Sequence, residues 1–494
     1  MPCAGGSGAS YPSMALRTAN IVGSGPNGLA AAITLAQRGV AVTVFERNKR
    51  IGGACSTAEI TLPGFHHDLG SSCYPLGVAS PFFSTLPLAQ YGLRWIEPEV
   101  PLAHPRPDGR AVLLKHDLNA TAAQFAIRGD EHDARAWRLL LASSVRDFPA
   151  LVADFTQPLL RIPSNPVAMA TFGTAAFWPA AMLAKLVFRH DDARVLFAGC
   201  AGHSVLPLSH IVSAAVAVVL AAAGHTKGWP VIAGGAQSLS DALAAYLREL
   251  GGTIVTEHPV TALRELPPAD VTLFDTSAQS LRTIAGDALS PAFRTRLAHF
   301  RRGPGIFKID YALSGPIPWA DPACLRAATV HVGGSLEEMA RSEHDAFVGR
   351  LPPAADDKPF LILVQPSVCD PSRAPEGRHT AWAYCHVPAG STADRTAAIE
   401  AQIERFAPGF RDVVLARGTW NSEDLAAWNP NLLGGDVSGG SMTLGGMLAR
   451  PTLRTYRTSN PRLYLCSSST PPGGGVHGMS GHNAAVAALK DHLS

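Results

Sequence analysis

Three glycines interrupt an apolar segment near the start of the chain, in the sequence IVGSGPNGLAAAITLAQRGVAVTVFER at residues 21–47. Alternation and β-branching near residues 19–22 predict a strand, residues 27–37 have helical periodicity, and residues 41–45 predict a second strand. A strand, a glycine turn, a helix and a second strand in this order form a βαβ unit with parallel strands. The segment therefore predicts an α/β fold.

Each glycine of this turn has its own expected role. Gly23 permits the tight turn, Gly25 lets the backbone approach a pyrophosphate, and Gly28 lets the helix pack closely on the strand. Pro26 and Asn27 open the helix, whose free N–H groups and dipole favour an anion. The turn therefore predicts a dinucleotide with its pyrophosphate on residues 23–28, and the alternative is a glycine turn without a ligand.

An acidic residue closes the second strand. Glu46 follows Gly28 by eighteen residues, and a carboxylate at this spacing accepts hydrogen bonds from the ribose hydroxyls of the adenosine. It would also repel a 2′-phosphate, so NADP is not expected at this site. Gly52 and Gly53 form a second glycine turn six residues after the acid, near the same pyrophosphate.

The acid, the basic Arg47 after it and the glycine doublet resemble the FAD signature of the FAD-dependent amine oxidase and phytoene desaturase superfamily. The segment GWPVIAGGAQSLSDALAAYLRELGGTIVTEHPVTAL at residues 228–263 resembles the P-x-GG helix of that family and the strand after it, on which the backbone of Val260 would hold the adenine side. The segment RLYLCSSSTPPGGGVHGMSGHNAAVAAL at residues 462–489 resembles the strand, glycine-rich turn and helix that lie under the flavin in the desaturases. Bacterial phytoene-dehydrogenase-like oxidoreductases are the members that the chain resembles.

The resemblance implies FAD as the cofactor and a binding set drawn from all these segments. That set is Gly23, Gly25, Pro26, Asn27, Gly28, Glu46, Arg47, Gly52, Gly53, Ala54, Ser71, Val260, Ser468, Ser469, Val476, His477 and Met479. The helix of the last segment is expected to begin near Val476 and to present its N–H groups to the flavin. Residues 467–469 and Pro471 differ from the Gly-x-Gly and histidine often found in the family, and the carboxylate of amine oxidases near Ser468 is missing. These departures favour a desaturase over an amine oxidase.

The resemblance also implies a fold of the glutathione reductase-2 and amine oxidase type. In such a fold a Rossmann-type FAD-binding domain is interleaved with a substrate domain made of a mixed β-sheet and a helical cap. We expect a loose tail at residues 1–13, an FAD-binding domain from residues 14–90, 225–300 and 455–494, and a substrate domain from residues 91–224 and 301–454.

Two segments of the expected cap are strongly apolar. Residues 167–184 contain no charge over eighteen positions, and residues 211–224 form a run of fourteen. A transmembrane helix needs about 20 apolar residues, so no membrane span is expected. One interpretation is a pair of buried core helices. The other is a surface that contacts a bilayer peripherally and admits a small lipophilic substrate.

Composition excludes several other classes. The net charge is only +2 and no basic run occurs, so nucleic acid is not expected as a partner. The eight cysteines show no CxxC pair, which argues against a metal site or a redox dithiol and for a cytoplasmic, reducing location. No second GxGxxG follows a strand, so the electrons are expected to leave to oxygen, a quinone or another carrier. The sequence does not indicate an oligomeric state.

Histidines are the natural candidates for a catalytic base. His477 follows the last glycine of the flavin-facing turn and is the candidate, with a backbone-only role as the alternative. His203 could reach the cavity or be a core histidine, and the adjacent His66 and His67 would face opposite ways on a strand and cannot bind one metal together. Three functions remain: an FAD oxidoreductase that desaturates or oxidises a C–C or C–N bond, a redox-neutral flavin-dependent isomerase, and a non-enzymatic binding protein stabilised by flavin.

Overall fold

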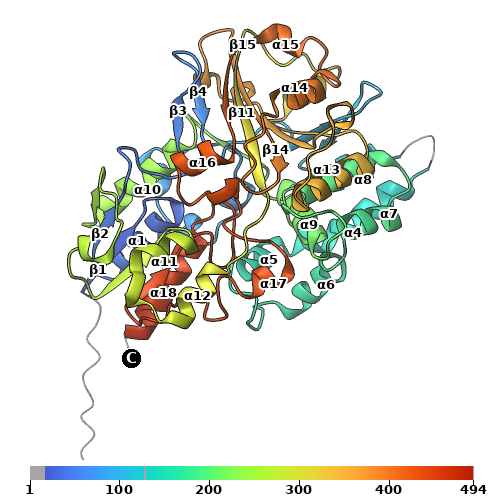
Figure 1. Cartoon of the computed structure of the whole chain (residues 1–494). Coiled ribbons are helices and arrows are strands. Elements are labelled where there is room, and N and C mark those ends of the chain that lie inside the picture. The colour runs from blue at the N-terminus through green and yellow to red at the C-terminus, as the bar shows by residue number, and fades with distance from the viewer. Residues whose placement is uncertain (1–16, 127–129, 493–494) are drawn as a thin grey trace, which may run out of the picture.

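The computed structural model describes residues 17–126 and 130–492. The expected tail at residues 1–13 lies outside the described residues. Two large sheets organise the chain, one parallel and one mixed, and a group of helices covers the second (Figure 1). This mixed α/β architecture confirms the predicted fold class.

The parallel sheet has five strands in the order β16-β10-β1-β2-β9. They are β1 (Thr18–Val22), β2 (Ala41–Phe45), β9 (Thr253–Val255), β10 (Val271–Phe274) and β16 (Leu463–Leu465). Helix α1 (Pro26–Ala36) joins β1 to β2, so the predicted βαβ unit is confirmed. Its bounds were readable from sequence because the proline and glycines at its start and Gly39, at φ 78°, after its end are local signals.

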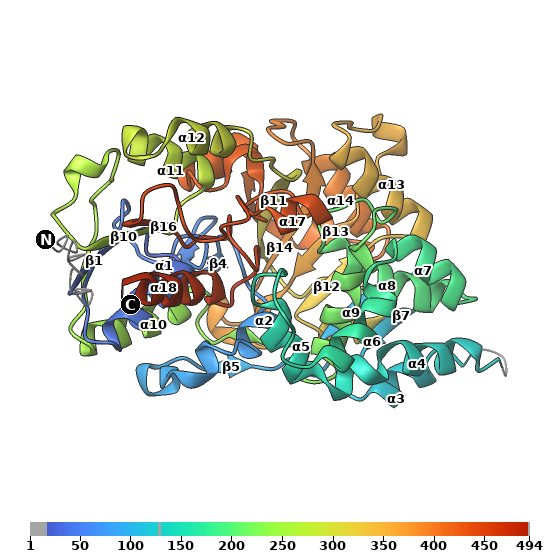
Figure 2. The ribbon, with the colours of Figure 1, turned by 90° about the horizontal axis from the view of Figure 1, so that it is seen from below.

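Helices cover both faces of this sheet (Figure 2). One face carries α1, α10 (Gln237–Glu249) and α18 (Met479–His492), and the other carries α11 (Ala278–Ala285) and α12 (Pro291–Ala298). Small residues bring α1 and α18 together, since a Cβ on Gly481 would lie 1.7 Å from the carbonyl oxygen of Asn27. The C-terminal helix is thereby held beside the start of α1, at the glycine turn.

The mixed sheet has seven strands in the order β15-β11-β14-β13-β12-β6-β7, and its neighbours are antiparallel except for β12 and β6. They are β6 (Leu102–Pro105), β7 (Ala111–Leu114), β11 (Gly305–Leu313), β12 (Thr329–Val332), β13 (Leu361–Val364), β14 (His379–Val387) and β15 (Val414–Trp420). Residues alternate between its faces. Leu361 and Leu363 pack under α14 (Thr396–Glu404) and α15 (Phe410–Val413), whereas Ile362 faces the cap helices.

The helical cap packs on the face of the mixed sheet that carries Ile362. It contains α4 (His132–Arg146), α5 (Phe148–Phe155), α6 (Pro166–Ala176), α7 (Ala180–Val187), α8 (Asp191–Gly202), α9 (Ser213–Gly224) and α13 (Leu336–Phe347). Within residues 17–126 and 130–492 no single helix is long and apolar enough to cross a membrane, although α6 and α7 would pass that test as a pair bent by 89°. The interpretation of both apolar segments as buried helices holds for α9. It is wrong for residues 167–184, in α6 and α7, where Val167 is 77% and Met182 50% exposed.

Smaller elements complete the fold. They are the hairpin of β3 (Thr57–Glu59) and β4 (His66–Asp68), the pair of β5 (Trp95–Ile96) and β8 (Val231–Ile232), α2 (Pro75–Val78), α3 (Leu118–Ala123), α16 (Ser422–Trp428) and α17 (Leu444–Leu448). The strands of the parallel sheet all fall in the segments expected for the FAD-binding domain, and those of the mixed sheet in the segments expected for the substrate domain. The β5–β8 pair joins the two sets, and the domain boundaries themselves stay a prediction.

Candidate cofactor and substrate site

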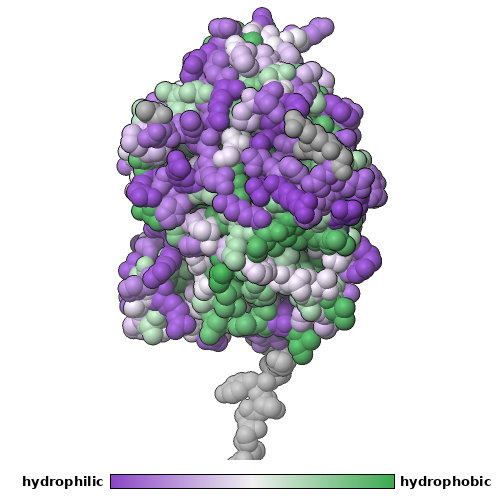
Figure 3. All heavy atoms as spheres, turned by 90° about the vertical axis from the view of Figure 1, so that its right-hand side faces the viewer, coloured by the Kyte–Doolittle hydropathy of each residue, from purple (hydrophilic) through white to green (hydrophobic). Residues whose placement is uncertain are grey.

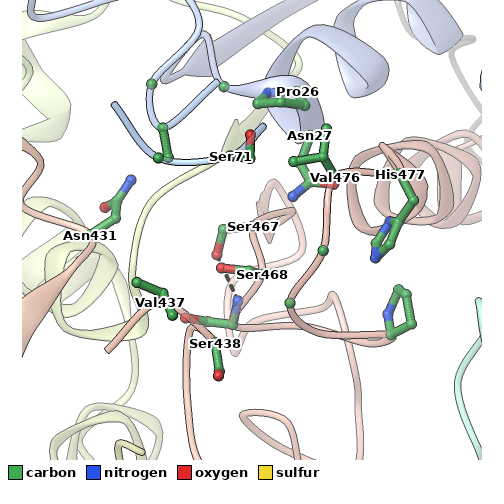
Figure 4. Close-up of a pocket in the computed structure, with 18 of the residues that line it drawn as sticks. Pro26, Asn27, Ser71, Asn431, Val437, Ser438, Ser467, Ser468, Val476 and His477 are labelled. Atoms are coloured by element: carbon green, nitrogen blue, oxygen red, sulfur yellow. Dashed lines mark hydrogen bonds between the residues drawn. The ribbon is translucent and has the colours of Figure 1, made fainter. Parts of the chain in front are cut away.

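A single cavity of about 1440 Å³ runs from the glycine turn to the helical cap. This volume exceeds the roughly 300–1,000 Å³ of pockets for drug-sized ligands, so it has room for a dinucleotide and a second molecule. Its walls come from the β1–α1 turn, the C-terminal segment, the mixed sheet and the cap. Figure 4 shows the end at which the first two of these walls face each other.

The glycine turn forms one end of the cavity. Gly23 has φ 100°, which favours glycine, and a Cβ on Gly28 would lie 2.1 Å from the carbonyl oxygen of Gly23. The third glycine therefore allows the helix to pack on the turn, as predicted. Gly25 caps α1 without a side-chain hydrogen bond, and Pro26 and Asn27 line the cavity (Figure 4). The helix N-terminus thus lies at the cavity wall, where its N–H groups favour an anion.

Glu46 lies beside the turn and is 4% exposed. Its carboxylate accepts hydrogen bonds from the backbone N–H of Ser24 (3.0 Å), from the hydroxyl of Ser24 (2.6 Å) and from the backbone N–H of Asn48 (2.9 Å). The same side chain lines the cavity. It therefore fixes the turn to the end of β2 in addition to offering a negative charge to a ligand, a second role that sequence did not indicate.

Asp275 is a site residue that sequence analysis missed. It follows β10, and its Oδ2 accepts a hydrogen bond from the backbone N–H of Gly28 at 2.8 Å. A Cβ on Gly25 would lie 2.5 Å from the same oxygen, so the carboxyl group and not only a pyrophosphate requires a glycine there. Burial raises the pKa of Asp275 to about 7, with a smaller contribution from the nearby Glu46. The one available signal was an acid directly after the apolar run VTLF.

The C-terminal segment faces the turn across the cavity. Ser468, Ser469, Val476 and His477 all line it, and Figure 4 shows Ser468, Val476 and His477. Helix α18 begins at Met479 and not near Val476, because Gly475 and Gly478 have φ values of 113° and 69° that a helix cannot contain.

Two predicted roles change with this later helix start. The backbone N–H of Met479 donates to Nδ1 of His477 at 3.1 Å, so that N–H group is not free for a cofactor. The Met479 side chain is 2% exposed and packs in the core around α1, and it does not line the cavity.

His477 is 1% exposed, and burial lowers its pKa to about 4. Because Nδ1 accepts a hydrogen bond from Met479, the neutral ring carries its proton on Nε2, and a hydrogen bond to the backbone of Gly474 partly opposes the fall in pKa. His477 therefore lines the cavity as a neutral ring. A role as general base stays an untested prediction that this arrangement does not favour.

The other predicted residues divide into two groups. Glu46, Arg47, Gly53, Ala54, Ser71 and Val260 line the cavity together with Gly23, Gly25, Pro26 and Asn27, whereas Gly28, Gly52 and Met479 do not. The placement of Val260 on a strand is wrong, since β9 ends at Val255 and Val260 lies in the loop beyond it. Gly52 lies in a tight turn with φ 107°, where a Cβ would come 2.5 Å from the carbonyl oxygen of Cys55.

The mixed sheet supplies a largely apolar wall. Its cavity-facing residues include Ile306, Lys308, Thr329, Ile362, Val364, Trp382 and Tyr384. Lys308 is 1% exposed, and its Nζ pairs with Asp310 and lies 5.2 Å from the centre of the Trp382 ring. Burial lowers the pKa of Lys308, and the Asp310 carboxylate opposes that effect. Sequence analysis missed this buried ammonium group because a lone lysine in a strand carries no motif.

The segment before β16 closes the nucleotide end. Asn431 accepts a hydrogen bond from the backbone N–H of Ser277 (2.8 Å) and donates to the carbonyl oxygen of Asp275 (3.2 Å). Arg450 is 1% exposed and donates to the carbonyl oxygens of Ser468 (2.9 Å) and of Ser438. Residues expected in the substrate domain therefore help to shape the nucleotide end.

His203 lies at the cap end of the cavity, beside Trp229. Its Nε2 lies 2.8 Å from Nε2 of His331, so one ring donates a hydrogen bond to the other. Burial lowers the pKa of His203 to about 3, which keeps both rings neutral. His203 is thus both a partnered, half-buried histidine and a cavity residue, and the two interpretations from sequence do not exclude each other.

His66 and His67 face opposite sides of a strand, as their adjacent positions predict. On β4, His67 is 1% exposed and approaches Asp310 at 3.8 Å, whereas the side chain of His66 is 43% exposed. Asp68 is paired with Arg373 at 2.9 Å and accepts from Ser72 at 2.5 Å. Within the ranges that the structure describes, no group of three His, Cys, Asp or Glu residues could hold a metal ion.

Comparisons with known proteins agree with this geometry. Residues 21–86 match the model of the NAD(P)-binding Rossmann-like domain. The mouse pyridine nucleotide-disulfide oxidoreductase domain-containing protein 2 is 28% identical over 95% of this chain and 93% of its own length. A limonene dehydrogenase subunit from Castellaniella defragrans is 32% identical over a shorter stretch, 24% of this chain and 21% of that protein.

Solved structures share the fold over nearly the whole chain. An oxidoreductase from Methanosarcina mazei has a TM-score of 0.63 at 16% identity and covers 96% of this chain and 100% of its own. A variant of putrescine oxidase has a TM-score of 0.62 at 16% identity, covering 97% and 98%. Cyclohexylamine oxidase from Brevibacterium oxydans has a TM-score of 0.58 at 15% identity, covering 97% and 100%. The chain therefore carries an NAD(P)-binding Rossmann-like domain within a fold that it shares with oxidoreductases of the amine oxidase type.

Proposed function

We propose that this chain is an FAD-dependent, phytoene dehydrogenase-like oxidoreductase that removes a hydride from an apolar substrate. The observation that carries the proposal is the single cavity, which joins the glycine turn and Glu46 at one end to an apolar wall and cap at the other. A nucleotide at the turn and a lipophilic molecule at the cap would therefore share one enclosed space. The reaction would be a desaturation, or an oxidation of a C–C or C–N bond.

The residues present fit a dinucleotide, and the resemblance of the acid, the glycine doublet and the C-terminal segment to flavin enzymes favours FAD. The glycine turn, with α1 behind it, suits a pyrophosphate, and Glu46 suits the ribose. The segment with Ser468, Val476 and His477 adds a second wall opposite the turn, where the resemblance to the desaturases expects the flavin. Bound FAD would supply the two-electron acceptor at this wall, and the electrons would leave to oxygen, a quinone or another carrier.

The chain's own residues would bind and orient the substrate. Ile306, Ile362 and Trp382 offer apolar contact and exclude water, which strengthens the electrostatic interactions inside the cavity. Lys308 would hold a positive charge in this dry wall, with Asp310 fixing its position. The neutral ring of His477 would line the cofactor end.

The apolar cap supports a lipophilic substrate. Phe172, Val216, Val219 and Leu220 line the cap end, and His203 adds one polar group there. The limonene dehydrogenase relative is named for a terpene hydrocarbon, whereas putrescine oxidase and cyclohexylamine oxidase are named for amines. The missing carboxylate near Ser468 and the apolar walls favour a hydrocarbon-like substrate over a charged amine.

Anaerobic bleaching of the flavin tests this proposal. Purified flavin-loaded protein is mixed without oxygen with polyenes, terpenoids, fatty acyl compounds and amines, and the flavin absorption band is followed. Bleaching by a lipophilic compound is expected. Turnover of such a compound without an external acceptor would instead indicate the redox-neutral isomerase. Bound FAD that none of the compounds reduces would indicate the non-enzymatic binding protein.

We also propose a peripheral contact with a lipid surface. Exposed apolar side chains gather on the cap face below a polar half of the molecule (Figure 3), and they are Leu159, Leu160, Ile162, Val167, Phe177, Trp178, Met182, Leu186 and Ile211. Leu159 and Phe177 also line the cavity, so a lipid surface at this face would lie at a cavity wall. Patches of this kind are uncommon on proteins that stay in water.

Co-flotation with phosphatidylcholine vesicles tests the lipid contact. The protein is expected to float with the vesicles, and the double variant Leu160→Ser, Ile162→Ser is expected to lose most of that binding. Leu415→Ser, at a position that is 47% exposed on the edge strand β15, is the control and should float as the native protein does. A native protein that stays at the bottom of the gradient would rule the contact out.

A further inference from the structure

Two buried carboxyl groups flank one anion-binding turn. Glu46 approaches it from the end of β2, and Asp275 approaches it from the end of β10, the strand on the other side of β1. A pyrophosphate on the same turn would bring further negative charge to this place. Three like charges in a buried site repel one another strongly, so at least one group must be neutral when such a ligand is bound.

The contacts differ between the two acids. Glu46 accepts three hydrogen bonds, from two backbone N–H groups and one hydroxyl, so its carboxylate oxygens already have donors. Asp275 accepts one, from the backbone N–H of Gly28. In the described part of the chain no cation pairs with Asp275, and the residue is only 8% exposed. Asp275 is therefore the acid that would take up the proton.

The other groups that face Asp275 do not change the assignment of the proton to Asp275. The β1–α1 turn carries no titratable side chain at residues 22–29, and β2 contributes Glu46, which disfavours a second negative charge. From the strand side, Cys466 is a buried neutral thiol whose pKa is raised by burial. The neighbouring loop contributes Asn431, which donates to the Asp275 backbone and carries no charge.

We propose that Asp275 binds FAD as a neutral carboxylic acid beneath the pyrophosphate turn, so that FAD binding takes up one proton from solvent. The proposal rests on the proposed function, in that FAD occupies this turn. In the protonated form one oxygen still accepts from Gly28, and the hydroxyl becomes a donor beside the anion-binding turn. Asp275 would thereby act as a pH-dependent positioning residue for the cofactor.

The sign of the pH dependence follows from the burial of the group. In the flavin-free protein burial raises the pKa of Asp275 to about 7, so the carboxyl group is ionised at higher pH and must regain its proton when FAD binds. The dissociation constant is therefore expected to be flat below about pH 7 and to rise about tenfold per pH unit above it, because one proton is taken up on binding.

Equilibrium dialysis of flavin-loaded protein against known FAD concentrations, between about pH 6 and about pH 9, measures the slope of the FAD dissociation constant against pH. Asp275→Asn keeps an acceptor for Gly28 and holds no titratable proton, so its dissociation constant should not depend on pH and should be lower than that of native protein at the alkaline end. Glu46→Gln is the matched control from the other flank. It should bind FAD more weakly and with a smaller pH slope than native protein, because it removes one of the three negative charges, whereas Asp275→Asn should abolish the slope.

Calorimetry of FAD binding to native-sequence protein from which the flavin has been removed, in two buffers of different ionisation enthalpy, keeps the test independent of any variant. Near about pH 8 it should show uptake of about one proton per FAD. A flat native profile, no proton uptake, or an Asp275→Asn protein that keeps the native slope would each overturn the proposal while leaving FAD binding intact. Native protein that binds no FAD at any pH would overturn the proposed function as well.

Discussion

Replacing Glu46 is expected to weaken the fold and cofactor binding together. Glu46→Ala removes the acceptor for the backbone N–H groups of Ser24 and Asn48 and for the Ser24 hydroxyl. Each buried donor left without a partner costs about 1–3 kcal/mol. Water from the cavity that Glu46 lines can replace part of this, so we expect the free energy of unfolding to fall by about 3 kcal/mol.

Glu46→Gln separates the charge from the hydrogen bonds. The amide oxygen can still accept from one or two of the donors, so the free energy of unfolding should fall by only about 1 kcal/mol. Both variants lose the charged acceptor for the ribose hydroxyls. Glu46→Ala should therefore raise the FAD dissociation constant at least about tenfold, which corresponds to about 1.4 kcal/mol.

Urea unfolding followed by tryptophan fluorescence gives the stabilities, and dialysis against FAD gives the affinities. We expect the free energy of unfolding to fall in the order native protein, Glu46→Gln, Glu46→Ala. If Glu46→Ala were as stable as native protein, the hydrogen bonds to the turn would be unimportant. If it bound FAD with unchanged affinity, Glu46 would make no contact with the ribose.

Three further outcomes are expected. Gly25→Val should yield colourless protein, because its Cβ would lie 2.5 Å from Asp275 Oδ2 at the pyrophosphate turn, and a variant that keeps its full yellow colour would refute that assignment. Lys308→Met should leave a buried Asp310 without its partner and lower stability by about 3–5 kcal/mol. Adding Asp310→Asn to Lys308→Met should restore stability. Reduction of the flavin by substrate should stay at least about tenfold slower than in native protein. A native reduction rate in the double variant would show that Lys308 takes no part in the reaction. NADH and NADPH in large excess should reduce the flavin only very slowly in anaerobic stopped-flow mixing, and rapid, saturable bleaching would indicate a pyridine-nucleotide reductase instead.

The parts predicted well from sequence are those with local signals. The glycine turn, α1 and β2 lie within one short segment, where alternating apolar residues, a proline and glycines each have a conformational meaning. Glu46 was identified by its distance from Gly28 along the chain. The placement of Ser468, Val476 and His477 opposite this turn required the resemblance to a known family, because the two segments meet only in the folded chain.

The parts that sequence analysis missed depend on contacts between distant segments. Asp275 lies 247 residues from its partner Gly28. Lys308 and Arg450 are isolated basic residues whose burial only the packed sheet and loops create. Periodicity likewise could not show which sides of α6 and α7 stay exposed, since both helices are apolar over most of their length.

The identity of the molecule bound at the glycine turn tests the central claim most directly. Native protein is purified without added cofactor, its absorption spectrum is recorded, and the small molecule released on denaturation is identified by mass spectrometry. We expect a flavin spectrum and FAD in stoichiometric amount with the chain. Release of NAD or NADP, or a colourless protein that binds no FAD on titration, would contradict the account.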